Sequence, residues 1–519
     1  MAGPPRFQIS SQRTLRYLIR DLSFRDFSGG LNVRDAQPEL GQNEQPDDWN
    51  FTFDERGGAS SRLGFVKLNG VAFTGAGAGV VTNVWPSTTV ADIITQAGTN
   101  LYLGTTNVIR KTFTTAERAG FADFAGKLYA IHPTDGMFST TDGITWTILA
   151  SVNAPKGTCL YVFQNKLWAA GSKTNKSRVA FSVAGDGLTW NVADWVDINE
   201  KDSEQIVALY GASGTDIALG KFGLVAFKRR SAYRIFDSAT GAYVTIDQRV
   251  GAASAIACVA IHGRIYTINE FGIHWTTGFS PMVAAGERLE PLWDPAQVNF
   301  ANLDKWCAGV HKQRVFFSLC RAGSAANDLA LEHNPSLGWI APGSNAMSAY
   351  ANNAQQTEKL YGGSPTVSGQ VYELLKGGTD DGAPIVWRLQ TRWFELGGGY
   401  LAQPWRLRVR GKGSASVVMR TDYSTADSWG AALNLVDPSA LLWDTGLLWD
   451  TGLLWQVPTA QATADLFPVG TAKAVSLRFT GTTSTSDNLP AILGAGSGPE
   501  VGAFRVYGFE LVYGPLAYA

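Results

Sequence analysis

Short segments in which apolar and polar residues alternate recur along the middle of the chain. Each runs through a turn residue, a basic or polar residue, an aliphatic residue and then aromatic, small or apolar residues. The seven aliphatic positions are Leu101, Leu128, Leu167, Leu224, Ile265, Val315 and Leu360. Most intervals between them are close to the roughly 40–50 residues of one propeller blade. Because small four-stranded sheets bury their faces by packing radially, the pattern predicts an all-β fold containing a β-propeller of about six to eight blades.

A second repeat runs in step with part of the first. The segments 138–146 and 181–190 each read as a strand, an Asp-Gly turn and a second strand, with a Trp at the end. The residues of this turn motif are Asp142, Gly143, Trp146, Asp186, Gly187 and Trp190. The two segments resemble the Asp-box hairpins of sialidase-like propellers, although Asp142 is displaced by one position and the second copy has an extra residue. In that family the box is structural, so the resemblance implies blades and not catalysis.

The residues on either side of the repeats differ from them in composition and in hydrophobic pattern. Residues 1–75 carry Pro, Gly and Asn at turn-like spacings, and we expect an N-terminal extended arm with the first strands. Residues 76–379 contain the repeats and are assigned to the propeller. After a turn cluster at 377–382, regular alternating segments such as 405–410 predict a separate C-terminal β-sandwich or jelly roll over residues 380–519.

The C-terminal part contains an unusual repeat. Leu-Leu-Trp-Asp-Thr-Gly occurs twice in succession and is followed by Leu-Leu-Trp, between residues 441 and 455. So many Leu and Trp side chains would make an adhesive surface if they were exposed. Two interpretations stay open: a loop buried within the domain, or a contact with a subunit or partner through Trp443, Trp449 and Trp455.

The bulk composition excludes several classes of protein. Charged residues make up 17% of the 519 residues and the net charge is −1, so no basic field exists to hold nucleic acid. DNA that passes through a channel without sequence-specific binding is compatible with this charge. The four cysteines form no Cys-x-x-Cys pair and are expected to be buried thiols of a protein made in a reducing cytoplasm. No membrane span and no secretory signal are apparent, and stable membrane insertion is not expected.

The sequence contains few patterns that indicate catalysis or metal binding. The motifs HExxH, GxSxG and the P-loop do not occur, and the five His residues have no metal-site spacing. Acidic stretches such as 197–204 are typical of solvated faces. The most basic patch comprises Lys221, Lys228, Arg229, Arg230 and Arg234. It reads as one exposed edge, with Arg229 and Arg230 as a candidate contact surface for DNA or lipid headgroups. We expect no catalytic residue, no metal and no cofactor.

The N-terminal part carries a resemblance to a known class of proteins. Its arm or assembly residues are Gly29, Gly30, Leu31, Asn32, Asn43 and Glu44, followed by Asn50, Arg62 and Gly64. With the phrase at 378–385 and Thr391 and Trp393, this pattern resembles the tail-nozzle, stabilisation and hub proteins of tailed bacteriophages. The resemblance implies a structural component of the virion tail, synthesised in the host bacterial cytoplasm. It also implies a ring homo-oligomer at the head–tail or tail-tip region, which binds other tail proteins and supports assembly and genome ejection.

Two alternatives remain open. The first is a sialidase-like propeller that binds or hydrolyses glycans, for which hydrolysis would require two carboxylates held across a cleft. A sialidase would also need three arginines on separate blades, whereas Arg229, Arg230 and Arg234 lie within one short segment. The second alternative is a host-contacting baseplate or fibre-attachment protein, which differs from the tail component only in its location. The expectation is that the protein is not an enzyme.

Overall fold

The computed structural model describes residues 20–54, 56–212, 223–237, 242–351, 359–396, 401–435, 462–483 and 504–515. The chain divides into two compact units, one of residues 63–383 and one of residues 1–62 together with 384–519. All regular structure in the described residues is β-strand or short 3-10 helix. None of the described helices is long and apolar enough to cross a membrane.

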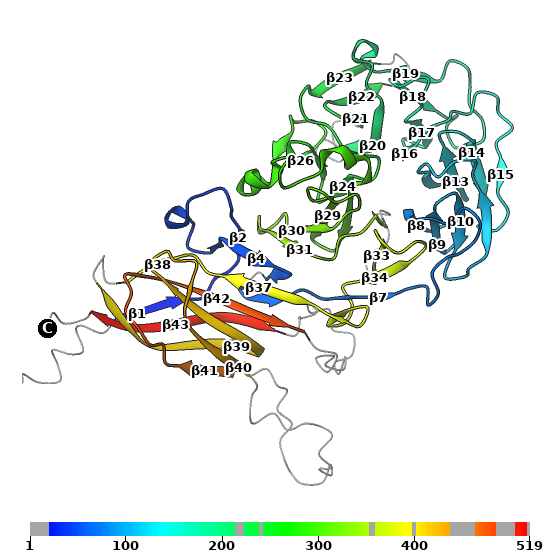
Figure 1. Ribbon diagram of the computed structural model, residues 1–519. Coiled ribbons are helices and arrows are strands. Elements are labelled where there is room, and N and C mark those ends of the chain that lie inside the picture. Colours follow the sequence, from blue (N-terminus) through cyan, green and yellow to red (C-terminus); the bar gives the residue numbers. More distant parts are fainter. Residues whose placement is uncertain are drawn as a thin grey trace, which may run out of the picture. The chain divides into compact units, whose positions relative to one another are not determined.

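Residues 63–383 form a seven-bladed β-propeller, which confirms the all-β propeller expectation (Figure 1). The strands of blades one to three are β8 (Val81–Ser87), β9 (Asp92–Ala97), β10 (Asn100–Leu103), β11 (Ile109–Thr112), β12 (Gly120–Phe124), β13 (Lys127–His132), β14 (Gly136–Thr140), β15 (Thr147–Ile148), β16 (Cys159–Phe163), β17 (Lys166–Ala170), β18 (Arg178–Phe181) and β19 (Trp195–Asp197). Those of blades four to six are β20 (Ile206–Ala212), β21 (Gly223–Lys228), β22 (Ala232–Asp237), β23 (Ala242–Asp247), β24 (Cys258–Ile261), β25 (Arg264–Asn269), β26 (Gly272–Thr276), β27 (Val283–Ala284), β28 (Cys307–His311), β29 (Arg314–Leu319), β30 (Leu329–His333) and β31 (Ile340–Gly343).

The seventh blade closes the ring with strands from both ends of the unit. It contains β32 (Ala349–Tyr350), β33 (Leu360–Gly363), β34 (Val371–Leu374), β7 (Phe65–Lys67), β35 (Thr379–Asp380) and β36 (Ala383–Pro384). β7 pairs antiparallel with β34, so that Phe65 lies opposite Leu374. The first strand of this blade contacts the first strand of blade one. The start and the end of the propeller are therefore held together by strand pairing.

The seven repeated aliphatic positions are all buried, with at most 1% exposure. Six of them lie on the second strand of a blade, from Leu128 on β13 to Leu360 on β33. Leu101 is the exception, because it lies on the third strand of blade one. Large aromatic side chains fill the space between blades, as Tyr129 and Trp190 do in the cluster that joins blades two and three. The repeat thus marks the inner core of the propeller.

The second unit is one antiparallel sheet that curls into a nearly closed barrel. Its strands are β1 (Arg20–Phe24), β4 (Asp47–Trp49), β5 (Phe51–Phe53), β6 (Ala59–Ser61), β37 (Val386–Gln390), β38 (Phe394–Glu395), β39 (Ala402–Thr421), β40 (Asp427–Leu435), β41 (Ala462–Leu466), β42 (Ala474–Thr482) and β43 (Arg505–Pro515). A separate parallel pair is formed by β2 (Gly30–Leu31) and β3 (Glu44–Gln45). Among the described residues, the short 3-10 helices are η1 (Gln37–Glu39), η2 (Glu200–Asp202), η4 (Glu287–Trp293) and η5 (Phe300–Lys305).

The 20-residue strand β39 makes the sheet continuous. Its first half pairs with β43 and β41, and its second half pairs with β42 and β40. The register shifts at Gly411, where a Cβ atom would overlap the carbonyl of Arg505. Such bulges bend a strand from one sheet face to the next. A C-terminal sandwich was expected, and the bent strand joins its two faces into one sheet.

The residues before the propeller do not form an arm of their own in the described part of the chain. β1 pairs with β43, and β4 pairs with β37, so N-terminal strands belong to the same sheet as the C-terminal ones. The expected divisions at 75 and 380 are replaced by divisions at 62 and 383. The physical reason is that N-terminal strands complete a sheet whose other strands lie more than three hundred residues later in the sequence.

Candidate functional site

Several polar networks of the propeller lie in the connections and turns at one of its ends. In a blade of four antiparallel strands, the turn between the second and third strands and the connection to the next blade emerge at the same end. We call this end the loop face, and we define it by the connections 113–119, 149–158, 198–205 and 248–257 and the turns 133–135, 171–177, 229–231 and 270–271. Loops positioned on a stiff scaffold are the usual place for binding residues.

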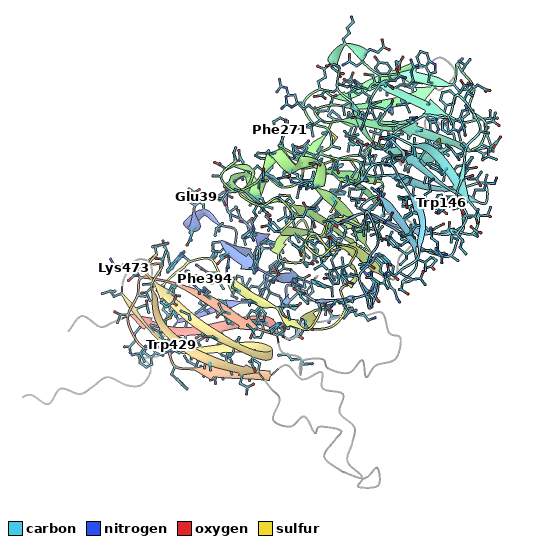
Figure 2. The ribbon with its side chains drawn as sticks, turned by 45° about the vertical axis from the view of Figure 1, so that its right-hand side comes forward. Glu39, Trp146, Phe271, Phe394, Trp429 and Lys473 are labelled. Carbon is cyan, nitrogen blue, oxygen red and sulfur yellow. The ribbon has the colours of Figure 1, made fainter. Side chains whose placement is uncertain are left out.

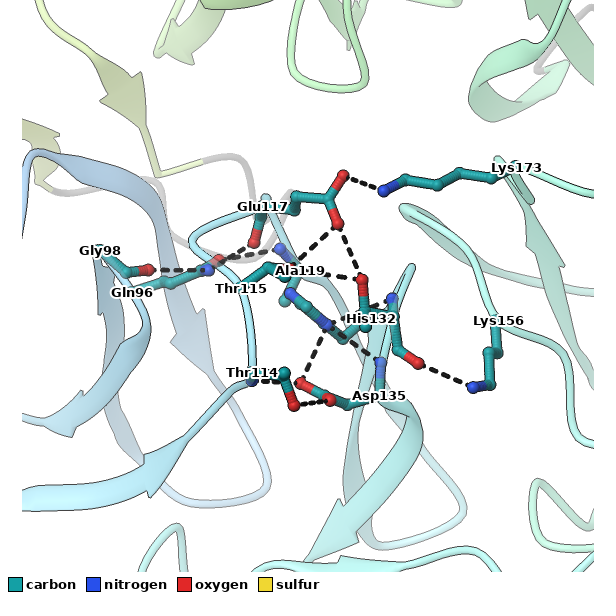
Figure 3. Close-up of polar contacts among 11 residues, drawn as sticks. Gln96, Gly98, Thr114, Thr115, Glu117, Ala119, His132, Asp135, Lys156 and Lys173 are labelled. Carbon is teal, nitrogen blue, oxygen red and sulfur yellow. Dashed lines mark hydrogen bonds and ion pairs between the residues drawn. The ribbon is translucent and has the colours of Figure 1, made fainter. Parts of the chain in front are cut away.

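A network centred on Glu117 and His132 ties blades one to three together at this face (Figure 3). Glu117 accepts hydrogen bonds from Thr115 and Thr134 at 3.0 and 2.9 Å, and its carboxylate pairs with Lys173 at 2.5 Å. Burial opposes the charge, but the bonds from Lys173 and the two threonines outweigh it and lower the pKa of Glu117. The carboxylate is thus held ionised by partners from one connection and two turns.

His132 lies at the base of the same network. Its ring is fully buried and stacks on Phe113 at a centroid distance of 4.4 Å. The Nδ1 atom accepts the backbone N–H groups of Thr134 and Asp135 at 3.4 and 3.2 Å. Burial lowers the pKa of His132, although Asp135 acts in the opposite direction. The ring is therefore a neutral group that packs against Phe113 and stabilises the turn at 133–135.

The acidic stretch and the basic patch predicted from the sequence come together on blades three to five. The Lys228 side chain has 0% exposure and its ammonium group donates to Asp202 at 2.6 Å, with Ser177 and the carbonyl of Asn199 as further acceptors. Arg229 and Arg230 are exposed but both pair with Glu270, at 3.5 and 2.6 Å. The exposed aromatic ring of Phe271 follows Glu270 (Figure 2). The candidate contact surface of Arg229 and Arg230 is therefore largely neutralised.

A hollow of about 430 Å³ opens beside this cluster, and we call it the Tyr243 pocket. Its lining consists of Asn199, Asp202, Glu204, Arg230, Ser231, Tyr233, Tyr243, Thr245 and Gln248. The side-chain amide of Asn199 donates to Tyr233 at 2.9 Å and to Asp202 at 3.0 Å, while its backbone N–H donates to the Tyr243 hydroxyl at 3.1 Å. Sequence reasoning missed the two tyrosines, because they lie on strands β22 and β23 with no motif around them.

The predicted turn motifs are structural, as their placement between third and fourth strands shows. Asp142 accepts the backbone N–H groups of Ile144 and Thr145 at 2.8 and 2.9 Å, and these bonds lower its pKa. Gly143 has a φ of +70°, which favours glycine. Trp146 lies at the border of blades one and two (Figure 2).

The second copy of the turn motif is built in a similar way. Asp186 accepts the N–H of Leu188 at 2.8 Å, and the indole of the buried Trp190 donates to the carbonyl of Gly187 at 3.0 Å. A side chain at Gly187 would meet the ring of Tyr129 at 2.6 Å. Both motifs therefore fix hairpins against neighbouring blades.

The residues of the N-terminal motif form a cluster of hydrogen-bonded polar groups in the barrel unit, which we call the polar knot. Gly30 and Leu31 pair with Glu44 and Gln45 in the small parallel ladder, and a Cβ atom at Gly29 would lie 2.5 Å from the carbonyl oxygen of Asn43. The side-chain amide of Asn32 donates to the carboxylate of Glu44 at 2.6 Å, and Glu44 also accepts the N–H of Gly41.

Two further motif residues, Asn50 and Arg62, bond to each other elsewhere in the barrel unit. Asn50 donates to the carbonyl of Val386 at 2.7 Å and accepts from Arg62 at 2.7 Å. All of these motif residues have structural contacts within the chain. Trp443, Trp449 and Trp455 lie outside the described residues, as does Lys221.

The four cysteines are buried and form no disulfide. Burial raises the pKa of Cys159, Cys258 and Cys307 to about 12, so their thiols stay protonated. In the parts of the chain that the structure describes, no group of three His, Cys, Asp or Glu side chains is placed to hold a metal ion.

No protein-family model matches the chain, and no curated protein matches it. Among solved structures, the computationally designed Ika8 protein, in a crystal form of symmetry P63, covers 67% of this chain and 99% of its own. The two share 11% sequence identity with a TM-score of 0.38. A similarity at this level carries no argument about function. None of these comparisons connects the chain with a bacteriophage protein, so the tail assignment stays a prediction.

Proposed function

We propose that this protein is a non-enzymatic structural component of a bacteriophage tail. It would occur in several copies around the tail axis, bind other tail proteins, and support assembly and genome ejection. The proposal rests on the sequence resemblance and on the hydrogen bonds that the resembling residues make within the barrel unit. It does not require a cofactor or a metal.

The observation that carries the proposal is the polar knot of the N-terminal motif. Asn32 and Glu44 bond to each other while both are almost fully buried, at 1% and 7% exposure. Buried polar groups are costly unless their partners are placed accurately, so such a set specifies one backbone arrangement. A resemblance that resides in these positions concerns the architecture of the barrel unit rather than a reaction. This supports a scaffold role.

The barrel unit also exposes large apolar side chains. Trp405 is 52% exposed, Phe467 68% and Val469 73%. Exposed apolar groups of this size are used for contacts between proteins when they lie on one surface. They support the proposal that this unit contacts other subunits. Duplex DNA would then pass through the ring formed by several copies, without sequence-specific binding.

The proposal is tested by the mass and the location of the native protein. Light scattering on the purified chain should give a mass of several copies, alone or with a neighbouring tail protein. Antibodies against the chain should label the tail of phage particles from the strain that encodes it. Label at the head–tail junction or around the tail axis supports a nozzle or hub. Label confined to fibres favours the host-contacting alternative, and particles without label contradict the proposal.

A further inference from the structure

The Tyr243 pocket has features of a ligand site that neither the tail proposal nor the sequence motifs explain. Its volume of about 430 Å³ is within the roughly 300–1,000 Å³ typical of small-molecule sites. Its side chains come from the connection between blades three and four and from three segments of blade four. These segments converge only in the folded propeller. We propose that this pocket binds a neutral oligosaccharide.

The charges of the pocket favour a neutral ligand. Asp202, Glu204 and Glu270 carry three negative charges at or beside the pocket, and Lys228, Arg229 and Arg230 carry three positive ones. The Lys228 ammonium is held beneath the pocket by Asp202, and Arg230 is bonded to Glu270. An anion would find both cations already paired, and a cation would meet them close to the carboxylates. The balance disfavours either kind of ion.

The hydrogen-bonding groups match a ligand that both donates and accepts. The hydroxyls of Tyr233 and Tyr243 each accept a bond from Asn199 and, among the described residues, have no acceptor for their own hydrogens. The second carboxylate of the pocket, Glu204, accepts the backbone N–H of Arg230 at Oε2, and within the described part of the chain its Oε1 atom has no donor. Exposed amide and hydroxyl groups of Gln248 and Thr245 complete the lining. Sugar hydroxyl groups both donate and accept, so they can satisfy these side chains together.

The aromatic side chains provide the apolar contact that a sugar ring needs. Tyr243 is 37% exposed and packs edge-on against the buried Tyr233, with ring centroids 5.8 Å apart. Its hydroxyl is fixed by the Asn199 N–H, so the orientation of the ring is set before any ligand arrives. A rigid aromatic ring with a polar tip contributes contact area at low conformational cost.

A second hollow supports an oligomeric ligand rather than a single sugar. It has a volume of about 320 Å³ and is lined by the half-exposed Trp195 and by Arg178, whose guanidinium lies 3.7 Å from the indole ring centre. Arg178 follows Ser177 in the sequence, and Ser177 contacts Lys228 beneath the Tyr243 pocket. The turn 171–177 thus contributes side chains to the second hollow, and its last residue bonds to Lys228, which in turn bonds to Asp202 in the lining of the Tyr243 pocket.

The experiment measures binding of soluble neutral hexasaccharides to the full chain. The probes are α-1,4-glucose, β-1,4-glucose and β-1,4-N-acetylglucosamine hexamers, and a sialylated oligosaccharide is the anionic comparison. Calorimetry and saturation-transfer NMR should detect saturable binding of at least one neutral hexamer, tighter than binding of its monosaccharide. Y243A should weaken this binding by about tenfold or more, and E204Q by about threefold or more. W405A, which removes an aromatic ring that is more exposed than Tyr243 and belongs to the other unit, should leave the binding constant unchanged.

Three results would overturn the proposal. One is the absence of saturable binding for every neutral hexamer up to about 10 mM, since weaker affinity is not a specific site. Another is a binding constant that is the same in Y243A and E204Q as in the original chain. The third is tighter binding of the sialylated probe than of all neutral ones. Y243F keeps the ring and should retain more binding than Y243A, so a folding defect of Y243A would not hide the answer. The inference is independent of the tail proposal.

Discussion

Replacing Gly64 with alanine should weaken the strand contacts that close the propeller at blade seven, which we call the seam. Gly64 lies just before β7, the strand that completes the seventh blade. A Cβ atom there would overlap the carbonyl carbon and oxygen of Thr379 and lie 2.9 Å from its nitrogen. No side-chain rotation relieves this overlap, because both groups belong to the backbone. The two segments must separate by about 1.5 Å to restore ordinary contact distances.

The cost follows from the bonds that cross the same seam. Gly64 donates to the carbonyl of Gly377 at 2.8 Å and accepts from Lys376 at 2.9 Å, and Phe65 accepts from Asp381 at 2.7 Å. Each bond contributes about 1 kcal/mol net, so their loss would destabilise the propeller by about 3 kcal/mol. With a urea slope of about 3 kcal/mol per M, the midpoint should fall by about 1 M.

The cysteines provide an assay that reports on the propeller alone. All four lie between residues 63 and 383 and all are buried, so a thiol reagent labels them when this unit opens. Urea-dependent labelling of the G64A variant is compared with that of G70A. Gly70 is six residues later and has nothing within 4 Å of its Cβ position. Equal midpoints for G64A and G70A would refute the reasoning.

Three more changes test other parts of the structure. K228M removes a fully buried ammonium and should destabilise the propeller by about 3 kcal/mol in the same labelling assay, whereas R229M, at an exposed position, should cost less than about 1 kcal/mol. N50A removes one buried and one partly buried hydrogen bond at a residue with a φ of +59°. It should lower the free energy of unfolding of the barrel unit by about 3 kcal/mol, and N50G should lose less. Burial, aided by a nearby arginine, lowers the pKa of His333 to about 4, against about 6.5 in the unfolded chain. The unfolded chain therefore binds a proton at His333 at a higher pH than the folded chain, so the free energy of unfolding is unaffected by this residue above about pH 6.5 and falls as the pH drops towards 4. Between about pH 7 and 5 the fall should be about 2 kcal/mol, and H333Q should lack it.

Each of these expectations has a clear contrary result. A K228M protein as stable as R229M would mean that the buried pair contributes nothing beyond a surface pair. Equal melting of N50A and N50G would show that the left-handed backbone at this position carries no strain. An H333Q protein with an unchanged pH profile would assign the acid sensitivity to other groups, among which His311 also has a pKa lowered to about 4 by burial and nearby cations.

The two functional proposals depend on different parts of the chain, so they can be tested separately. A tail scaffold depends on the barrel unit and its N-terminal knot, while glycan binding depends on blades three and four of the propeller. A variant such as E204Q should therefore leave assembly into particles unchanged. A variant such as N50A should reduce assembly in proportion to its loss of stability. Failure of one proposal would leave the other standing.

The amino-acid sequence by itself determined the repeat and the strands and blades that the repeat predicts. Alternating segments with an aliphatic and an aromatic residue required strands with a buried face, and their spacing required blades. The Asp-Gly turns at Asp142 and Asp186 were equally local, because the side chain bonds the backbone two or three residues ahead. Features of this kind depend on neighbours in the chain, so they can be predicted without a structure.

Only the tertiary structure decided the blade count, the chain divisions and the pocket. The segment at Leu101 looks like the other six but lies on a third strand, since strand position depends on what pairs on either side. β7 and β34 are about three hundred residues apart, and so are β4 and β37. Hydrogen bonding between such distant strands has no local signature. The Tyr243 pocket is similar: its charges neutralise each other, and its tyrosines face Asn199, only after blades three and four have packed together.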